Sequence, residues 1–450
     1  MIGLVRRFLA SLGFKAPLIT ALPLPFYWIF GRRWHAAFLV NIVAMLILFA
    51  AVWQIGKRLR SERAGLIAVY IVGTLPLLYG LSRWYLVEYP MAALVAAAFL
   101  LALVTAGSAK IAPAVLLGFT CGLGLLLKAD FPLFVLPMLI YVLWRRGARA
   151  SVVLPILLPC IALGAPWYAY HWRATLDNAI AAGFGASAVV QGTGAIFSVS
   201  AIRAYLGLVM YRGVSPYYVL LTVAASIAVA SRRRFEVFRQ IAPLWLWLLP
   251  FLIFVFGGNK DVRYIAPLPP AFALGAACIL DAAAERARWL AVPVLVFPLV
   301  ASLAISFGWP YDAADVGYAN RYDARSWGQD EILSAIASDG VFRYGERKRI
   351  LLGSDRGHFN ANNFELSIVQ WQLPLQVDTT AYSTSLNDVL GQAAGAAYFV
   401  YKEGGEPESA FFNLHSTELL RRLKQSAEWQ ELPFACAIPD GGTAHILRHR

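Results

Sequence analysis

The chain has 450 residues, of which 59% are hydrophobic and 14% are charged, and its formal net charge is +13. This composition is far more apolar than that of an ordinary soluble domain and indicates a membrane protein. The positive charge would suit nucleic acid, but the basic residues alternate with long apolar runs, so we expect no nucleic-acid partner.

The N-terminal segment, residues 1–34, is the first predicted element. It begins like a signal peptide, but Lys15 interrupts its apolar run, and three prolines would break a spanning helix (Pro17, Pro23 and Pro25). We interpret residues 16–30 as a broken helix lying at the outer membrane interface. A poor transmembrane span is the alternative.

Residues 35–309 form the predicted membrane domain. A hydrocarbon core of about 30 Å needs roughly 20 helical residues, and fewer where the helix ends lie at aromatic belts. Ten apolar runs approach this length, which predicts a polytopic α-helical membrane protein with about ten spans. The runs are 35–53, 66–81, 91–106, 111–127, 131–144, 151–168, 214–230, 241–257, 265–280 and 290–308.

The links between these runs differ in charge, and the difference predicts the side on which each lies. Arginine and lysine concentrate in 54–65, 145–150 and 231–240, so the positive-inside rule places these links in the cytoplasm. The link 281–289 joins them by parity. The same parity places outside everything after about Trp309 and four further links, namely 82–90, 128–130, 169–213 and 258–264.

Residues 310–450 are more polar, and apolar runs of strand length alternate there with helical patterns. We therefore expect a small exterior α/β domain at the C-terminus. Its predicted strands are 349–354, 375–379 and 396–402, its predicted helices are 362–373 and 415–429, and a hairpin is expected around 440–442.

The four cysteines do not predict a disulfide framework. Three of them lie within apolar runs, and Cys436 stands alone in the exported part. No group of cysteine and histidine residues has the spacing of metal ligands.

The predicted exterior links place ionisable residues beside aromatic residues and prolines. Arg83 and Glu88 lie in SRWYLVEYPM, Lys128 and Asp130 lie in KAD, and residues 258–270 read GNKDVRYIAPLPP. This composition indicates a water-filled cavity near the outer interface, in which lysine and arginine would suit the phosphate of an anionic lipid. Two alternatives remain open: the cations extend to water as many do at helix ends, and Glu88 is an ordinary acid at a helix start.

Four segments, taken in order, carry a resemblance to a known family. They are FKAPLITALPLPFYWIFG, GKRLRSERAGLIAVYIVGTLPLLYGLSRWYLVEYPM, LGFTCGLGLLLKADFPLFVLPMLIYVLWRR and NKDVRYIAPLPPAFAL. Over about residues 14–308, the chain resembles the membrane core of the polyprenyl-phosphate-sugar-dependent glycosyltransferases of the GT-C superfamily. Its relatives there are the protein O-mannosyltransferases and the lipid A aminoarabinose transferases.

The resemblance implies roles for individual residues. Lys15 matches the lysine of the family's KPP segment, and Lys260, Arg263 and Tyr264 match a lysine-x-x-arginine-tyrosine motif in its late exterior loop. These residues are thereby implied to lie near the phosphate of the donor lipid. The link that holds Arg83 and Glu88 is implied to line the same cavity, with Arg83 binding phosphate and Glu88 as the catalytic carboxylate.

The implied activity moves a sugar from a polyprenyl-phosphate donor to an exported glycan, lipid or protein in the bacterial inner membrane. A carboxylate must take the acceptor's proton, and cations or a divalent metal ion must neutralise the leaving phosphate. Whether Glu88 is the base, a metal ligand or a positioning group stays open at this point.

The sequence also departs from the family. The family opens with a transmembrane helix and an exterior loop carrying an Asp-Glu pair, whereas here no acidic residue precedes Glu62. We expect that the chain starts late, has lost activity, or uses Glu88 alone. The alternative function is therefore a catalytically incomplete relative that binds polyprenyl lipid or scaffolds a glycan assembly complex.

Overall fold

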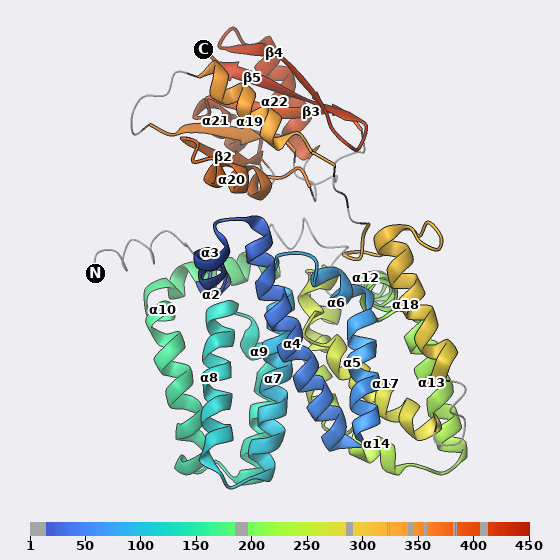
Figure 1. Cartoon of the computed structure of the whole chain (residues 1–450). Helices are drawn as coiled ribbons and strands as arrows, with labels where there is room; N and C mark the ends of the chain where they lie inside the picture. Colours follow the sequence, from blue (N-terminus) through green and yellow to red (C-terminus); the bar gives the residue numbers. More distant parts are fainter. Residues whose placement is uncertain are drawn as a thin grey trace. The chain divides into compact units, whose positions relative to one another are not determined.

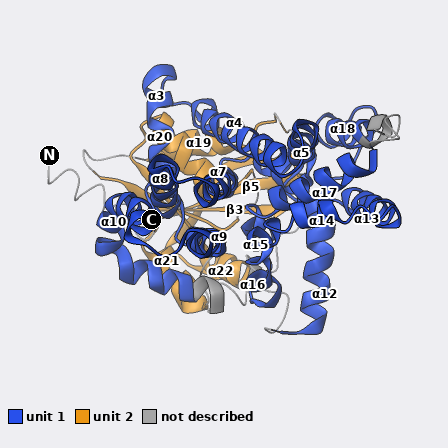
Figure 2. Ribbon diagram, turned by 90° about the horizontal axis from the view of Figure 1, so that it is seen from below, with its two compact units in different colours: residues 1–322 blue, residues 323–450 orange. Residues whose placement is uncertain are grey.

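The computed structural model describes residues 15–184, 197–284, 291–321, 323, 325–340, 346–354, 358–380, 383, 385–405 and 413–450. The chain divides into two compact units, Met1–Tyr322 and Asp323–Arg450 (Figure 2). The first unit is helical and contains the predicted membrane domain. The second contains a β-sheet with helices (Figure 1).

The described part of the first unit begins with two short helices in the predicted broken segment. They are α2 (Leu18–Ala21) and α3 (Leu24–Phe30), and each directly follows a proline, Pro17 and Pro23 respectively. Proline lacks the backbone N–H that a helix interior needs, but it is well suited to a helix start. The prolines therefore divide this segment as expected.

Among the described residues, three helices are long and apolar enough to cross a membrane. They are α4 (Trp34–Leu59), α7 (Glu88–Gly107) and α10 (Ala150–Phe184), the last over Ala150–Ile180. A further candidate is a pair of segments bent by 91° at Ser215, Val199–Val214 and Pro216–Ser231. This pair consists of α12 (Val199–Leu208), the π-helix η1 (Val209–Val214) and α13 (Pro216–Ser231).

The remaining helices of the first unit are shorter. They are α5 (Glu62–Thr74), α6 (Pro76–Leu81), α8 (Ile111–Leu127), α9 (Phe131–Arg146), α14 (Glu236–Gln240), α15 (Leu244–Leu248), α16 (Phe251–Phe256), the 3-10 helix η2 (Val262–Ile265), α17 (Pro269–Ala284) and α18 (Ala291–Phe307). Helices thus coincide with the predicted apolar runs, but ten membrane-length spans are not confirmed.

Two predicted spans are broken by proline. The run 66–81 is divided between α5 and α6 where Leu75 takes an extended backbone before Pro76. The run 241–257 is divided among short helices, because Pro243 and Pro250 each stand directly before a new helix.

The prediction that residues 169–213 form an exterior loop was wrong, because most of the described residues in this range are helical. Helix α10 continues to Phe184, and residues 199–214 are helical, while 185–196 lie outside the described residues. After Pro166 no proline or glycine interrupts α10 before Gly183, so the charged residues in this stretch do not end the helix.

A close helical hairpin joins α4 to α5. A Cβ atom added at Gly56 would lie 2.6 Å from the Cα atom of Gly65, so the two backbones touch and neither position has room for a side chain. Between the helices, the hydroxyl of Ser61 accepts a hydrogen bond from the backbone N–H of Ala64 at 3.0 Å and caps α5.

The same hairpin end carries an ionic tie to α17. Arg60 Nε lies 2.9 Å from Asp281 Oδ2, and Arg63 Nε lies 3.7 Å from Asp281 Oδ1. Arg60 also donates to the amide oxygen of Gln240 at 3.4 Å. Described residues of three links that the charge rule places together, 54–65, 231–240 and 281–289, therefore meet at one end of the bundle. In Figure 1, α14 lies at this lower end and α6 at the upper end.

The second unit contains a five-stranded mixed sheet in the order β2-β1-β3-β5-β4. Strand β1 pairs in parallel with β2 and β3, whereas β5 pairs antiparallel with β3 and β4. The strands are β1 (Lys348–Leu352), β2 (Leu375–Thr379), β3 (Tyr398–Gly404), β4 (Trp429–Ala437) and β5 (Gly442–His449). The helices are α19 (Gln329–Asp339), α20 (Ala361–Gln370), α21 (Leu386–Ala394) and α22 (Asn413–Gln425).

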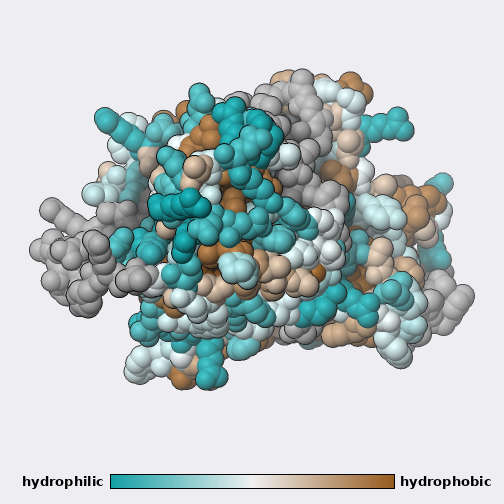
Figure 3. Space-filling model, turned by 90° about the horizontal axis from the view of Figure 1, so that it is seen from above, coloured by the Kyte–Doolittle hydropathy of each residue, from teal (hydrophilic) through white to brown (hydrophobic). Residues whose placement is uncertain are grey.

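Each face of this sheet has its own apolar core. One face packs Ile350 and Val400 with residues of α19 and α20, and the other packs Leu351 and Phe399 with residues of α21 and α22. The alternation of side chains along β1 and β3 explains the division. In the view of the molecule from above, the coloured surface shows many hydrophilic and near-neutral residues and scattered hydrophobic ones (Figure 3). Every predicted strand and helix of this region is present, and α19 and α21 are additional.

Candidate functional site

Glu88 is the first residue of α7, and its side chain is buried, with the residue only 4% exposed. Its Oε1 atom lies 3.4 Å from Nζ of Lys128 and 3.9 Å from Nε of Arg263. A buried carboxylate is tolerated only with such partners. Glu88 is therefore held in an ionic cluster, which is more than a solvated acid at a helix start would require.

The link before Glu88 is fixed by Asn41 of α4. The Asn41 amide nitrogen donates to the backbone carbonyls of Ser82 and Trp84, at 2.9 Å in both cases. Asn41 is itself buried among apolar residues of α4. These two hydrogen bonds hold the turn from which α7 begins, and so they fix the place where Glu88 enters the cluster.

Lys128 contributes the cation nearest to Glu88. It ends α8, lies 3.2 Å from Oδ2 of Asp130, and places its ammonium 4.3 Å from the centre of the Tyr264 ring. Burial disfavours the charged ammonium, but the carboxylates of Asp130 and Glu88 outweigh it and raise the pKa of Lys128. Lys128 is thus a permanent positive charge beside Glu88.

The second cation, Arg263, is positioned by Asp261. Asp261 caps η2, accepting the backbone N–H of Arg263 at 3.0 Å on Oδ1, while its Oδ2 lies 2.9 Å from Arg263 Nε. The guanidinium also donates to the hydroxyl of Tyr264 at 3.2 Å. Burial opposes the charge of Arg263, yet Asp261 and the neighbouring phenols raise its pKa. The carboxylate thus orients the cation toward Glu88.

Tyr318 completes this group from the segment that follows α18. Its hydroxyl donates to both carboxylate oxygens of Asp261, at 3.3 and 3.4 Å. Burial first, and then the charge of Asp261, raise the pKa of Tyr318, so the phenol stays protonated as a donor. We call these seven residues the Glu88 cluster: Glu88, Lys128, Asp130, Asp261, Arg263, Tyr264 and Tyr318.

In the cluster, carboxylates that could accept a proton lie beside cations that could bind a phosphate. Its carboxylates are Glu88, Asp130 and Asp261, and each has Lys128 or Arg263 as an ionic partner. Among the residues that the structure describes, no group of three histidine, cysteine or acidic residues is arranged to hold a metal ion. Positive charge in the cluster comes from the lysine and the arginine.

The side chain of Lys260 points away from that of Arg263, although both residues belong to the same sequence motif. Its ammonium donates to the backbone carbonyls of Phe254 and Val255, at 3.1 and 2.6 Å, and lies 4.9 Å from the centre of the Tyr205 ring. These are carbonyls at the end of α16, where a cation is favoured. The structure brings Arg263 and Tyr264 to Glu88 and directs Lys260 elsewhere.

Arg83 and Lys15 also lie apart from the cluster. The guanidinium of Arg83 donates to the hydroxyl of Ser306 at 3.0 Å and lies 4.6 Å from the centre of the Tyr79 ring. Arg83 thus faces α18, although it is only five positions before Glu88. Lys15 is exposed, and no described contact joins it to the cluster.

Sequence reasoning gave no role to four residues of the cluster: three of them lie in quoted exterior links, and the fourth, Tyr318, was not named. Lys128 and Asp130 could be placed in a cavity by their position between two apolar runs, but not beside Glu88. Asp261 stands within the quoted NKDVRY motif, where the family resemblance gives no role to it. Tyr318 carries no sequence signal, because nothing in its neighbourhood indicates that the chain folds back.

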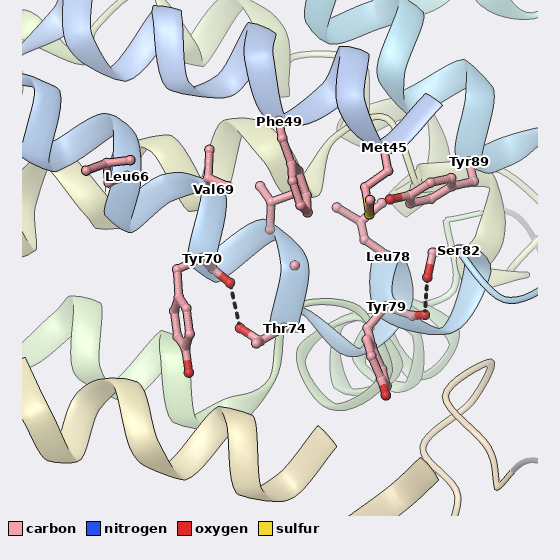
Figure 4. A pocket seen from close by; sticks show the side chains of 12 residues that line it. Met45, Phe49, Leu66, Val69, Tyr70, Thr74, Leu78, Tyr79, Ser82 and Tyr89 are labelled. Carbon is pink, nitrogen blue, oxygen red and sulfur yellow. Dashed lines mark hydrogen bonds between the residues drawn. The ribbon is translucent and has the colours of Figure 1, made fainter. Parts of the chain in front are cut away.

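A cavity of about 500 Å³ lies beside the link that precedes Glu88. Its walls come from α4, α5, α6 and the start of α7, with Tyr79, Ser82 and Tyr89 at the end nearer the link (Figure 4). The polar groups of Thr74 and Ser82 donate to their own helices, to the backbone carbonyls of Tyr70 and Tyr79. The remaining lining is largely apolar, so the cavity suits a hydrocarbon chain better than a sugar.

Comparisons with known proteins agree with this architecture. Residues 15–172 match the family described as dolichyl-phosphate-mannose-protein mannosyltransferase. A search of curated proteins gives no significant match.

Solved structures show the same fold. The crystal structure of ArnT from Cupriavidus metallidurans bound to undecaprenyl phosphate has a TM-score of 0.57 and 13% sequence identity, covering 96% of this chain and 87% of that one. The apo state of the same protein gives a TM-score of 0.56, 12% identity and coverage of 96% and 88%. The Archaeoglobus fulgidus oligosaccharyltransferase tethered with an acceptor peptide gives 0.50 and 13%, covering 86% of this chain and 60% of that one.

The likeness to ArnT extends over nearly the whole chain, including the second unit. The predicted resemblance is thereby confirmed: residues 15–172 match the mannosyltransferase family, and the chain is similar in fold to ArnT.

Proposed function

We propose that this protein is a membrane glycosyltransferase that moves a sugar from a polyprenyl-phosphate donor to an exported acceptor, with Glu88 as the base. The family match supports glycosyl transfer in general terms, and the ArnT structure supports a polyprenyl phosphate as the lipid. The observation that carries the proposal is Glu88 itself, a buried carboxylate held between Lys128 and Arg263.

The proposed reaction uses the groups of the cluster. The acceptor hydroxyl attacks the anomeric carbon, and its proton passes to Glu88. The bond from the anomeric carbon to the phosphate oxygen breaks, and its electron pair stays on the phosphate. Lys128 and Arg263 neutralise that charge, so they exchange carboxylate partners for phosphate oxygens as the donor binds.

The structure offers suitable surroundings for both the phosphate and the hydrocarbon chain of a lipid donor. The cations of the cluster suit its phosphate, and the apolar cavity beside the link suits part of its hydrocarbon chain. The acceptor would be a glycan, lipid or protein exported across the bacterial inner membrane, with the second unit on the exterior side. The sidedness follows from the charges of the links.

The test replaces Glu88 in the full-length protein. Sugar transfer to an acceptor hydroxyl releases the polyprenyl phosphate. Purified protein is therefore mixed with a total lipid extract of bacterial membranes and a periplasmic extract, which supply lipid-linked sugars and acceptors, and the released undecaprenyl phosphate is measured by mass spectrometry. In Glu88→Gln the release should fall by about 10²-fold or more, because the carboxylate that accepts the proton is gone.

Glu62 offers a matched control. Like Glu88 it is the first residue of a helix, but its side chain is 60% exposed and it lies at the opposite end of the bundle. Glu62→Gln should leave the release rate unchanged. An equal rate for Glu88→Gln and wild type would rule out Glu88 as the base.

A second candidate function is a lipid-binding relative without transferase activity. The observation that favours it is that each cluster carboxylate is already paired with a cation. Such a protein would bind undecaprenyl phosphate in an Arg263-dependent manner and release none from any lipid-linked sugar. The same assay therefore separates the two functions.

A further inference from the structure

The segment between α18 and the second unit folds back over the helical unit. Residues 316–319, which we call the strap, form a tight turn in which Val316 and Ala319 exchange backbone hydrogen bonds at 2.8 and 3.1 Å. The strap therefore has a defined conformation within the helical unit.

Two contacts fix the strap against the link that precedes Glu88. The indole N–H of Trp84 donates to the backbone carbonyl of Tyr318 at 3.2 Å, and the two rings meet edge to face at 6.4 Å. At Gly80 the two backbones touch, because an added Cβ atom would lie 2.3 Å from the carbonyl carbon of Tyr318. Only glycine allows this approach.

A third contact fixes the other side of the strap. Gly317 has a φ angle of +63°, and an added Cβ atom would lie 3.3 Å from side-chain atoms of Arg212 in η1. A residue with a side chain would be strained in this conformation. The strap is thus held between α6 and η1, and this position directs the Tyr318 side chain to Asp261.

We propose that Tyr318 is a positioning residue of the site, which acts through Asp261 to set the orientation of Arg263. Asp261 uses its two oxygens for the η2 backbone, for the Arg263 guanidinium and for the Tyr318 hydroxyl. The phenol shares the negative charge of Asp261. Because the carboxylate of Asp261 is partly neutralised by this hydrogen bond, the positive charge of Arg263 remains able to interact with Glu88 or with a phosphate.

The proposal gives the connecting segment a role beyond joining the two units. It supplies one polar group of the cluster, so the site is made of residues from four separated parts of the chain: the link at Glu88, the turn at Lys128, η2 and the strap. Only the identity of the ligand, a polyprenyl phosphate, depends on the proposed function. The hydrogen bond from Tyr318 to Asp261 is testable without any substrate.

The first experiment measures amide hydrogen exchange in the full-length protein in nanodiscs, with and without Tyr318→Phe. Phenylalanine keeps the ring and removes only the donor. Exchange of the Arg263 amide, which Asp261 holds, should become about tenfold faster, as expected for losing a hydrogen bond to a charged acceptor. The control is Tyr311→Phe, since Tyr311 lies in the same connecting segment and is 49% exposed. Unchanged exchange in Tyr318→Phe would overturn the proposal.

The second experiment measures the affinity for undecaprenyl phosphate in a double-mutant cycle. Tyr318→Phe should weaken binding by about threefold to tenfold, and it should cause no further loss in the Asp261→Asn background, because its effect passes through Asp261. Independent, multiplicative losses would show that Tyr318 does not act through Asp261, and the proposal would fail.

The two experiments distinguish this proposal from the proposed function. If Arg263→Gln leaves the affinity for undecaprenyl phosphate unchanged while Tyr318→Phe still accelerates exchange at Arg263, the phosphate site is wrong and the positioning role stands. If Arg263→Gln weakens binding while Tyr318→Phe changes neither exchange nor affinity, the phosphate site stands and the positioning role is wrong.

Discussion

The ammonium of Lys128 lies 3.4 Å from the carboxylate of Glu88, although forty positions separate the two residues in the chain. Helices α7 and α8 run between them in opposite directions, so the end of α8 returns to the start of α7. Because both charges are largely removed from water, each one depends on the other.

This dependence predicts the effect of Lys128→Met. The substitution keeps an unbranched side chain of nearly the same length but leaves the carboxylates of Glu88 and Asp130 without the ammonium. We expect a loss of about 1–3 kcal/mol in the free energy of unfolding, measured by thermal unfolding in nanodiscs. The double variant with Glu88→Gln should recover part of the loss, and a cycle without recovery would show that the pair is not coupled.

Asn41 gives a second prediction. Asn41→Asp preserves shape but cannot donate to the carbonyls of Ser82 and Trp84, and it brings a negative charge toward them. We expect a destabilisation of at least about 1–3 kcal/mol and a lower rate of sugar transfer, since the start of α7 would lose its fixed position. Asn41→Leu removes both hydrogen bonds without adding charge, and it should show a smaller form of both effects. Wild-type stability in both variants would contradict this role.

Arg263 and Lys260 should differ in a binding experiment. Arg263→Ala removes a half-buried cation that contacts the buried Glu88. It should weaken the binding of undecaprenyl phosphate at least tenfold, since removing one partner of a buried charged pair costs about 2–5 kcal/mol. Lys260→Ala removes a cation that bonds carbonyls at the end of α16, so it should lower the melting temperature more than the affinity. The two are read in the same nanodiscs, and an equal loss of affinity would place Lys260 at the phosphate as well.

The sidedness of the chain is tested by fusion. The charges of the links predict that the second unit lies outside the membrane. Alkaline phosphatase fused after Arg450 should therefore be active, whereas a reporter that works only in the cytoplasm should be silent. The opposite pattern would reverse the topology.

Element positions could be predicted more fully than the site. Hydrophobic runs located most helices of the first unit to within a few residues, but they missed the extension of α10 to Phe184 and the helices α12 and η1. In the second unit the predicted strand 375–379 has the bounds of β2. The amphipathic pattern of α19 (QDEILSAIASD) is visible afterwards in Ile332, Leu333 and Ile336, but it is short and follows an irregular stretch. Breaks at proline were foreseen near the N-terminus and overlooked within the runs 66–81 and 241–257.

The site could be predicted only in part because motif spacing does not give direction. Lys260 and Arg263 are three positions apart, yet Asp261 starts η2 between them and turns Arg263 toward Glu88, while Lys260 points back to α16. Arg83 and Glu88 share one link, yet Asn41 fixes that link so that they face different helices. Tyr318 arrives by a backbone contact with Gly80, for which sequence offers no sign.

The tie at Asp281 has a mechanical consequence for the far end of the bundle. Through Arg60 and Arg63, it joins the start of α5 to the last turn of α17. Glu88 comes after α5 and α6 in the chain, and Arg263 comes before α17. Asp281 lies near the C-terminal end of α17, whereas Arg263 precedes its N-terminal end, so the tie and the Glu88 cluster are at opposite ends of this helix. At about 1.5 Å per residue, the 16 residues of α17 make an arm of roughly 24 Å. A change in the tilt of α17 at Asp281 would therefore be largest at its other end, where Arg263 contacts Glu88 at 3.9 Å.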